Sequence, residues 1–485
     1  MKKVIVIYDD SLKPNKEIRS ITGDKSYGDT IFKRVTLKNR MREEIEKNKN
    51  VVSMYSISDE RENEKLKEEL TKMQEGRAVF YLYSNFGLAD TAQFQTLLTK
   101  TAYVNECYTV YCGDQPAAVM LPDVETYDKK AQQLLERNVL AERVETAAFM
   151  DLSDLNHFLI FITGGFDARF FNALAGDAYT VTKKSTKTEK IKSEYKFYYL
   201  LPDNMKMWFV MPYDYREDAN GASYTMERYH MTDIAIRFVH GAVSTEELSD
   251  ILDKLFYFIN IRGRKQVSEK EAKAVADALY VEKLKERMAD LKKLPAYSRF
   301  DALLSMGTDY AGIDAVVEKY LRLYEKIAAR PAENALAIGH GDLCFSNILY
   351  SREANLLKLI DPKGALNEED MYTDVYYDLA KLSHSICGCY DFFNSGLYLI
   401  TMDRDMKIHL SIDADAAPYI EVFKNYLEKN GFDYVRVRLY EASLFLSMLP
   451  YHMDQPGKVF GFLMNAIRIL EEVETCTKIW HFVLI

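Results

Sequence analysis

The sequence predicts an α/β sheet domain followed by an α+β domain whose second part is mostly helical. Apolar, β-branched runs alternate with charged helical stretches over roughly the first third of the chain, as expected for an α/β sheet. Shorter extended runs follow as far as Met226, and helical patterns dominate after His230. One strand–turn–strand pattern, between Asn347 and Ile360, interrupts these helices.

Length and composition exclude several classes of function. The chain has 485 residues, enough for about three domains, and a net charge of −10 excludes a basic nucleic-acid-binding surface. No apolar run reaches the ~18 residues of a membrane span, and Asp9 and Asp10 end the first apolar run too early for a signal peptide. The six scattered cysteines favour reduced thiols, so we expect a cytoplasmic protein.

The first domain is expected over residues 1–167. Its strands are short apolar runs, and the stretches between them carry charges at helical spacing. The expected strands are Lys2–Tyr8, Val51–Ile57, Ala78–Tyr83, Cys107–Cys112, Ala117–Leu121, Val144–Phe149 and Phe158–Thr163. The expected helices are Arg34–Asn48, Asp59–Gln74, Thr91–Val104 and Lys129–Val139.

The rest of the chain divides at a connector, Glu227–Tyr229. Before the connector, residues 168–229 contain short extended runs and one helix that ends ahead of Pro202. The expected strands are Phe170–Leu174, Tyr179–Lys183, Lys206–Pro212 and Ala222–Met226, and the expected helix is Thr188–Leu200. In residues 230–485 the expected helices are Asp233–Val239, Glu246–Phe258, Glu269–Asp290, Ile313–Ala329, Val375–Ile386, Ala416–Lys429, Val435–Leu449 and Gly457–Val473.

The stretch Ile338–Gly364 carries the residues that indicate chemistry. Asp342 follows His340-Gly341, Asn347 lies five residues later, and Asp361 ends the predicted hairpin. Phosphoryl transfer from ATP needs this set, because one aspartate accepts the proton of the acceptor hydroxyl while an amide oxygen and a second carboxylate hold Mg²⁺. The structural alternative makes Asp342 a helix cap, Asn347 a turn residue and Asp361 a strand terminator. The ordered set within one stretch favours the chemical interpretation.

These motifs resemble those of the aminoglycoside phosphotransferase and choline kinase family of small-molecule kinases. The resemblance rests on His-Gly-Asp at 340–342, Asn347, Asp-Pro-Lys-Gly at 361–364 and Tyr-Asp-Leu-Ala at 377–380. It implies a bilobal, α+β, protein-kinase-like domain over the C-terminal two-thirds, with a small lobe at 168–229 and a mostly helical large lobe at 230–485. It also implies that ATP and Mg²⁺ are used to phosphorylate a hydroxyl of a sugar or of an amino alcohol such as choline.

The kinase resemblance assigns a phosphate-binding lysine and its acidic partner. Strand alternation places Lys183 on the same face as the small apolar Val181, which favours Lys183 over Lys184 as the phosphate contact, although both can be solvated turn residues. Glu194, on the following helix, would pair with this lysine. Its alternative is a surface ion pair with Lys190, four residues earlier.

The same resemblance places the adenine at the connector between the lobes. Glu227 and Tyr229 belong to this connector, whose backbone groups bind the adenine edge in kinases.

The first domain resembles, in the order of its elements, the sugar nucleotidyltransferase fold. That family wraps the nucleotide phosphates in a glycine-rich loop and holds a metal with an aspartate. Here the segment Tyr8–Asn15 contains no glycine, and Ser84-Asn85 stands where the aspartate is needed. We therefore expect a nucleotidyltransferase-like sheet without nucleotidyl transfer.

Three functions remain open from the sequence. The first is a small-molecule kinase, and the combination of the two domains resembles enzymes of bacterial surface (capsular) polysaccharide biosynthesis. The second is a non-catalytic pseudokinase scaffold whose first domain binds a nucleotide sugar or a partner. The third is a bifunctional enzyme, which the missing glycine loop disfavours. The sequence sets neither the acceptor nor the oligomeric state.

Overall fold

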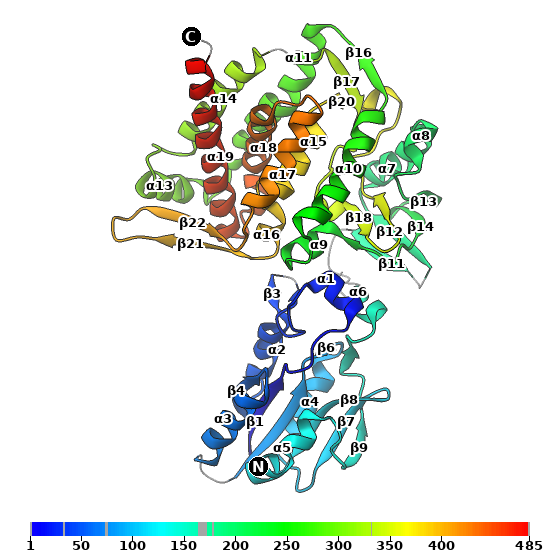
Figure 1. Ribbon diagram of the computed structural model, residues 1–485, viewed down its shortest axis with the longest axis vertical. Helices are drawn as coiled ribbons and strands as arrows, with labels where there is room; N and C mark the ends of the chain where they lie inside the picture. The colour runs from blue at the N-terminus through cyan, green and yellow to red at the C-terminus, as the bar shows by residue number, and fades with distance from the viewer. Residues whose placement is uncertain are drawn as a thin grey trace. The chain divides into compact units, whose positions relative to one another are not determined.

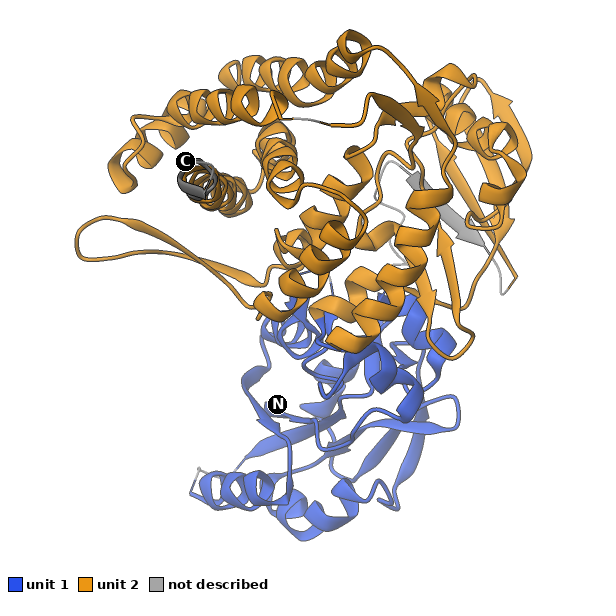
Figure 2. Cartoon of the chain, turned by 45° about the horizontal axis from the view of Figure 1, so that its top comes forward, with its two compact units in different colours: residues 1–169, 240–242 blue, residues 170–239, 243–485 orange. Residues whose placement is uncertain are grey.

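The chain folds as two units in the computed structural model, which describes residues 2–32, 34–72, 76–162, 172–176, 179–330 and 332–483. Unit 1 comprises residues 1–169 and 240–242, and unit 2 comprises residues 170–239 and 243–485 (Figure 2). None of the described helices combines the length and apolarity that crossing a membrane requires.

Unit 1 is built on a mixed six-stranded sheet in the order β4-β1-β5-β8-β7-β9 (Figure 1). The strands are β1 (Lys3–Asp9), β4 (Val51–Ile57), β5 (Arg77–Tyr83), β7 (Tyr108–Cys112), β8 (Gln115–Leu121) and β9 (Glu142–Glu145). The central strand β1 runs parallel to both β4 and β5, whereas β8 runs antiparallel to β5 and β7. The predicted α/β sheet is therefore confirmed.

Helices cover both faces of this sheet because its central strands are apolar on both sides. In β1 and β5 nearly every residue is buried. Helices α2 (Leu37–Glu46) and α4 (Thr91–Thr101) pack together, as do α3 (Glu60–Thr71) and α5 (Val124–Leu135). The smaller elements are α1 (Lys16–Thr22), β2 (Ile31–Phe32), β3 (Val35–Thr36), β6 (Phe86–Leu88) and β10 (Phe149–Asp151).

The expected strand Phe158–Thr163 is wrong, because this region forms helix α6 (Leu155–Ile162). Asp154 begins the helix, since its side chain accepts a hydrogen bond from the His157 amide at 2.9 Å and its carbonyl accepts one from Phe158 at 2.9 Å. A short apolar run is compatible with a strand or a buried helix, and here the capping residue decides.

Unit 2 begins with an antiparallel four-stranded sheet in the order β11-β12-β14-β13. Its elements are β11 (Asn172–Gly176), β12 (Thr180–Ser185), α7 (Thr188–Leu200), α8 (Asp203–Lys206), β13 (Pro212–Asp218) and β14 (Gly221–Glu227). Ile191 of α7 packs against Ala222 and Tyr224 of β14, which fixes the helix on the sheet. Part of the expected strand Phe170–Leu174 lies outside the described residues.

The expected strand Lys206–Pro212 is also wrong. The chain forms α8 first, and β13 begins only at Pro212. The segment between them pairs instead with strand β19 (Leu356–Leu359), where the Leu359 amide donates to the Trp208 carbonyl at 2.7 Å. This pairing joins the small sheet to the hairpin that precedes Asp361.

The remainder of unit 2 is mainly helical around one large apolar core. Its helices are α9 (Ile234–Val239), α10 (Thr245–Ile261), α11 (Glu269–Asp277), α12 (Lys283–Lys292), α13 (Tyr297–Gly307), α14 (Ile313–Ala328), α15 (Tyr377–Ile386), α16 (Tyr390–Asn394), α17 (Ala417–Lys429), α18 (Tyr434–Met448) and α19 (Pro456–Val483). Its strands are β15 (Thr232–Asp233), β16 (Arg264–Gln266), β17 (Ala335–Ile338), β18 (Ile348–Ser351), β19, β20 (Tyr372–Asp374), β21 (Tyr398–Met402) and β22 (Ile408–Ile412). The sequence missed the hairpin β21–β22.

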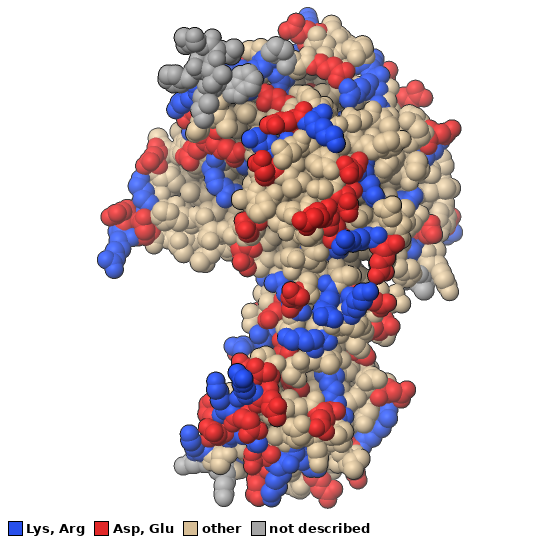
Figure 3. Space-filling model, viewed as in Figure 1, with Lys and Arg blue, Asp and Glu red and all other residues tan. Residues whose placement is uncertain are grey.

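Charges are interspersed on the face of the molecule seen in Figure 3. Lysine and arginine side chains alternate there with aspartate and glutamate side chains. This face therefore lacks the continuous basic surface that binds a phosphate backbone.

Candidate functional site

A buried lysine joins the small sheet to the hairpin of unit 2. Lys183, on β12, is 2% exposed, whereas Lys184 points to solvent as strand alternation requires. The Lys183 Nζ lies 2.7 Å from Glu194 Oε2 and 2.8 Å from Asp361 Oδ1. Burial opposes its charge, but the charges of Asp361 and Glu194 outweigh burial and raise the pKa of Lys183. The structure thus brings three of the predicted residues together.

Glu194 is held by more than the lysine. Its side chain is 1% exposed, and Oε2 also accepts a hydrogen bond of 3.0 Å from the Tyr224 hydroxyl. The Nζ of Lys190, a half-exposed side chain, lies 3.6 Å from Glu194 Oε1. The ion pair with Lys190 that the sequence left open is therefore present, as the longer of the two contacts that Glu194 makes with lysines. The main partners of Glu194 are buried, because α7 turns this residue toward the sheet.

The register of the hairpin β18–β19 places Asn347 opposite Ile360, the residue before Asp361. Ile348 pairs with Leu359, and the Ile360 amide donates to the Asn347 carbonyl at 3.0 Å. The hairpin itself is confirmed. Asp361 follows it with a φ of 54°, in the left-handed region that side chains other than glycine seldom adopt.

The loop after Asp361 docks on helix α7. Gly364 has a φ of 90°, and a Cβ there would lie 2.7 Å from the Glu194 amide nitrogen. The Ala365 amide donates to the Ser193 carbonyl at 3.1 Å. Only glycine permits this close approach, so the position of the Asp361 loop depends on the helix that carries Glu194.

Asp342 lies on the loop between β17 and the hairpin. Its Oδ1 is 2.8 Å from Lys381 Nζ, and its Oδ2 accepts a hydrogen bond of 3.2 Å from Asn347 Nδ2. Partial burial of the Asp342 carboxylate raises its pKa. The positive charge of Lys381 outweighs burial, so the pKa of Asp342 lies below its ordinary value. The side chain remains 44% exposed. Asp342 is therefore an ionised, accessible carboxylate.

A hydrogen bond to the Asp342 backbone orients the side chain of Asn347. Nδ2 donates to the Asp342 carbonyl at 2.8 Å, and none of the described residues donates to Oδ1. The oxygen of Asn347 and the carboxylate of Asp361 are hard oxygen donors, which suits Mg²⁺ better than softer metals. Among the described residues no cluster of three or more His, Cys, Asp or Glu side chains is arranged to hold a metal ion.

His340 is buried and neutral. Its Nε2 bonds to the Ile360 carbonyl at 2.9 Å, and its Nδ1 accepts the Asp342 amide at 3.2 Å, so the proton belongs on Nε2. Burial lowers the pKa of His340 further. The ring stacks on Phe209 at 5.7 Å between centroids. His340 therefore holds the loop against the end of the hairpin.

Two residues that the sequence did not assign fix this loop, Asp378 and Arg262. The Asp378 carboxylate accepts the amides of His340 and Gly341, each at 2.9 Å. It also pairs with Arg262 at 2.9 Å, and both side chains are fully buried. Asp378 belongs to the Tyr-Asp-Leu-Ala motif. A carboxylate within an apolar stretch of predicted helix is the sequence signal that could have identified it as a buried, paired residue.

Lys381 is the third unassigned residue. It lies on α15 one helical turn after Asp378, so both side chains reach the same loop. Asp342 raises the pKa of Lys381. The Lys381 ammonium on α15 therefore faces the Asp342 carboxylate on the neighbouring loop.

Glu227 and Tyr229 stay together at the end of β14. Burial and a hydrogen bond with Glu227 raise the pKa of Tyr229, and Lys358 Nζ lies 5.5 Å from the Tyr229 ring centroid. In the part of the chain described, neither side chain is hydrogen-bonded to Lys183 or Asp361.

Unit 1 carries a separate polar cluster at the carboxyl ends of β1 and β5. Asn85 donates to Asp151 at 3.1 Å and accepts from Arg137 at 2.8 Å. Asp10 accepts hydrogen bonds from Ser26 at 2.6 Å and from an amide, while burial raises the pKa of Asp10. The amide of Asn85 is thus engaged on both sides.

Comparisons with known proteins find similarity only among solved structures. No family model and no curated protein matches the sequence. A thermostable mutant of aminoglycoside phosphotransferase APH(4)-Ia in its apo form is similar over 65% of this chain and 98% of its own, with 11% identity and a TM-score of 0.37. A ternary complex of such a mutant with AMP-PNP and hygromycin B gives the same TM-score and identity over 65% and 97%. Aminoglycoside-3'-phosphotransferase of type VIII gives 0.31 at 12% identity over 59% and 97%.

Breaking the buried pair between Asp378 and Arg262 is expected to destabilise unit 2. Asp378→Leu leaves the Arg262 guanidinium buried without its partner, and Arg262→Met leaves the Asp378 carboxylate buried without its partner. Each single variant should lower the free energy of unfolding by about 3–5 kcal/mol. The double variant should lose less than the sum, as measured by urea unfolding of the full chain. Strictly additive losses would contradict the coupling.

Proposed function

We propose that unit 2 is an ATP- and Mg²⁺-dependent phosphotransferase acting on a hydroxyl of a small molecule. The observation that carries this proposal is the Lys183 ammonium held between Glu194 and Asp361. Asp361 follows the second strand of the hairpin, and Asn347 precedes its first strand at the same end. The proposed lobes are 168–229 and 230–485. A cation, a metal-binding pair and a base are the parts that phosphoryl transfer requires, because positioning and electrostatics dominate that reaction.

Each residue has a role in this proposal. Lys183 contacts the ATP phosphates, and Glu194 fixes its position. Asn347 Oδ1 and the Asp361 carboxylate hold Mg²⁺, which neutralises charge on the phosphates when it is bound. The adenine edge lies against the backbone of the connector Glu227–Tyr229.

Asp342 acts on the acceptor. Its ionised carboxylate accepts the hydrogen bond of the hydroxyl, aligns the oxygen with the phosphorus and takes the proton. Lys381 keeps this carboxylate ionised and supplies positive charge beside the oxygen atoms that carry negative charge in the transition state. We propose a sugar or an amino alcohol such as choline as the acceptor.

Unit 1 is proposed as a nucleotidyltransferase-like domain without nucleotidyl transfer. This rests on the absence of glycine in Tyr8–Asn15 and on Asn85, whose amide is engaged by Arg137 and Asp151. A role in surface polysaccharide biosynthesis is the pathway that this pairing of units suggests.

Replacing the base is expected to reduce turnover strongly. Asp342→Asn keeps the size of the side chain but removes its negative charge, so kcat should fall by about 10²–10⁴ while the KM for ATP changes little. The assay measures phosphorylation of the best acceptor found in a thermal-shift screen of sugars and amino alcohols with Mg-ATP. Asp405→Asn, an exposed carboxylate on the β21–β22 turn, is the matched control.

The outcomes of this assay separate the two classes of function. A non-catalytic scaffold predicts no acceptor phosphorylation by the wild type. Equal activity of the wild type and Asp342→Asn would remove Asp342 from the mechanism.

Removing the second carboxylate is expected to weaken nucleotide binding only when magnesium is present. Asp361→Ala should lower the affinity for Mg-ATP by at least about tenfold, because one of two protein ligands is lost. Calorimetric titration with ATP in Mg²⁺ and in EDTA measures the difference. Glu369→Ala, which removes an exposed carboxylate, is the control. An unchanged Mg²⁺ dependence in Asp361→Ala would refute the metal assignment.

Removing the neighbouring cation is expected to change the pH dependence. The pKa of Asp342 lies below its ordinary value, so the base stays ionised and the wild-type kcat should be flat between about pH 5 and 8. In Lys381→Gln the largest influence opposing burial is lost and the pKa of Asp342 rises, so kcat should decline as the pH falls toward 5. Lys381→Arg keeps the charge and should keep the flat profile. A flat profile in Lys381→Gln would show that Lys381 does not set the ionisation of Asp342.

A further inference from the structure

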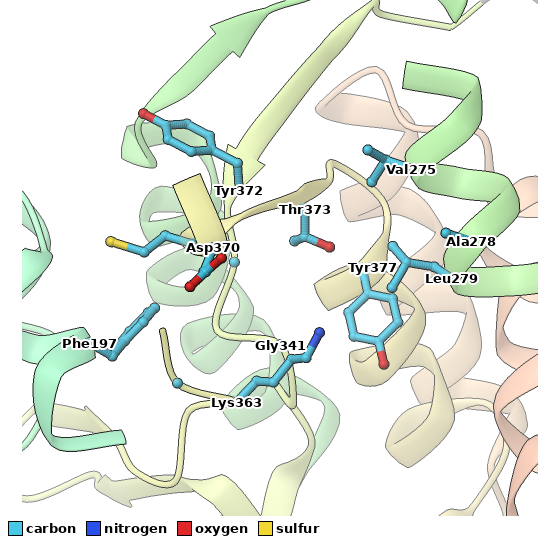
Figure 4. A pocket seen from close by; sticks show the side chains of 13 residues that line it. Phe197, Val275, Ala278, Leu279, Gly341, Lys363, Asp370, Tyr372, Thr373 and Tyr377 are labelled. Carbon is cyan, nitrogen blue, oxygen red and sulfur yellow. The ribbon is translucent and has the colours of Figure 1, made fainter. Parts of the chain in front are cut away.

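A cavity of about 200 Å³ lies behind the loop that carries Asp342 (Figure 4). Its lining comes from helix α7, helix α11 with the turn that follows, both site loops and the segment that leads into α15. The lining residues are Phe197, Val275, Ala278, Leu279, Gly339, Gly341, Lys363, Gly364, Asp370, Met371, Tyr372, Thr373 and Tyr377. The side chains of Asp342, Asn347 and Asp361 are not among these residues, although the loops that carry Asp342 and Asp361 both contribute to the lining.

Glycines of the loop that carries Asp342 form one wall of the cavity. A Cβ on Gly339 would lie 2.3 Å from Thr373 Cγ2, and one on Gly341 would lie 2.5 Å from Lys363 Cβ. Gly341 has a φ of 80°. The cavity is therefore lined by backbone without side chains at Gly339 and Gly341, and Gly341 directly precedes Asp342 in the chain.

The opposite wall is a π-helical turn at Ala278–Glu282, between α11 and α12. Ala278 and Leu279 of this turn face the cavity. Such turns are rare and are found frequently at functional sites, where the extra residue redirects side chains. This wall belongs to the helices inserted between α10 and the Asp342 loop.

The polar side chains at the Tyr377 end of the cavity are cationic or neutral. Lys363 pairs with no carboxylate in the described part of the chain, and its side chain extends across the cavity toward Tyr377 in Figure 4. Lys283 Nζ lies 3.4 Å from the Tyr377 hydroxyl and adds a second positive charge at that end. Asp370 is the acidic residue of the lining; its Oδ2 accepts the Asn367 side-chain amide at 2.7 Å, and Figure 4 shows it away from the end of the cavity where Tyr377 lies.

The rest of the lining is apolar. Phe197, Leu279 and Met371 offer an aromatic ring and two flexible aliphatic side chains. Binding sites for small molecules combine such a lining with a few polar groups that fix orientation. A volume of about 200 Å³ admits a molecule of roughly one ring.

We propose that this cavity binds a small organic anion, with its carboxylate or phosphate at Lys363 and Tyr377 and a compact apolar body against Phe197 and Leu279. The occupant contacts the backbone of both site loops, so its binding is coupled to the positions of Asp342 and Asp361. This site does not depend on the proposed phosphotransferase activity, because it is defined without nucleotide or acceptor.

Direct binding to the full-length protein without nucleotide tests the proposal. The probe is benzoate, and benzyl alcohol is its uncharged match in size. Titration followed by saturation-transfer NMR should give a dissociation constant of about millimolar or below for benzoate. Benzyl alcohol should bind about tenfold more weakly, because it lacks the charge-assisted hydrogen bonds. Phenyl phosphate, tested in parallel, distinguishes a phosphate from a carboxylate preference.

Two variants locate the bound probe. Lys363→Gln should abolish the preference for benzoate over benzyl alcohol, whereas Lys273→Gln on the outer side of α11 should keep it. Ala278→Trp fills the cavity from an exposed position and should abolish binding of both probes. Ala274→Trp, one turn earlier on α11 and also exposed, should not.

The outcomes decide the matter without an activity assay. Equal affinity for the charged and uncharged probes would overturn the anion preference. Benzoate binding that survives Ala278→Trp, in protein with an unchanged circular dichroism spectrum and thermal transition, would overturn the location. Absence of benzoate and phenyl phosphate binding at tens of millimolar would overturn the site itself.

Discussion

The buried ammonium of Lys183 is the interaction on which the arrangement of unit 2 depends. A charge that is 2% exposed is strongly unfavourable unless opposite charges surround it. Its two partners come from different elements, Glu194 from helix α7 and Asp361 from the loop after the hairpin. The sheet that carries Lys183, the helix and the loop must therefore occupy fixed positions relative to one another. A shift of any one of them removes at least part of the compensation of this buried charge.

A second buried charge fixes the other half of the site. Asp378 binds two consecutive backbone amides of the Asp342 loop and is itself neutralised by Arg262 at the end of α10. One helical turn later, Lys381 reaches the side chain of Asp342. Helix α15 thus sets both the backbone and the electrostatics of the loop. His340 joins this half to the Lys183 cluster, because its Nε2 donates to the Ile360 carbonyl and its carbonyl accepts the Lys363 amide, each at 2.9 Å.

Much of the local structure could be predicted from the sequence, and the failures have physical causes. The hairpin around Asn347 and the helix at Thr188–Leu200 are confirmed, since turn residues and Pro202 mark their ends. The strand expected at Phe158 is wrong because a short apolar run fits the periodicity of a strand as well as that of a helix. The helix is decided by Asp154, whose side chain caps its first turn. The segment around Phe209 was misplaced because its backbone pairs with Leu359, about 150 residues away in the chain.

The sequence by itself determined the chemical inventory: a histidine, two carboxylates and an amide at fixed spacing around a hairpin, with lysines on a preceding strand. Period and turn residues are local properties, so they can be read without the fold. Strand alternation and the kinase resemblance already favoured Lys183 over Lys184 and paired it with Glu194, but only the tertiary structure showed that Asp361 completes this cluster, that Lys381 faces Asp342, and that Asp378 and Arg262 hold the loop. Those contacts join residues from about ten to more than one hundred positions apart. They form because a buried charge requires an opposite charge nearby, and the partner comes from elsewhere in the chain, which no local pattern records.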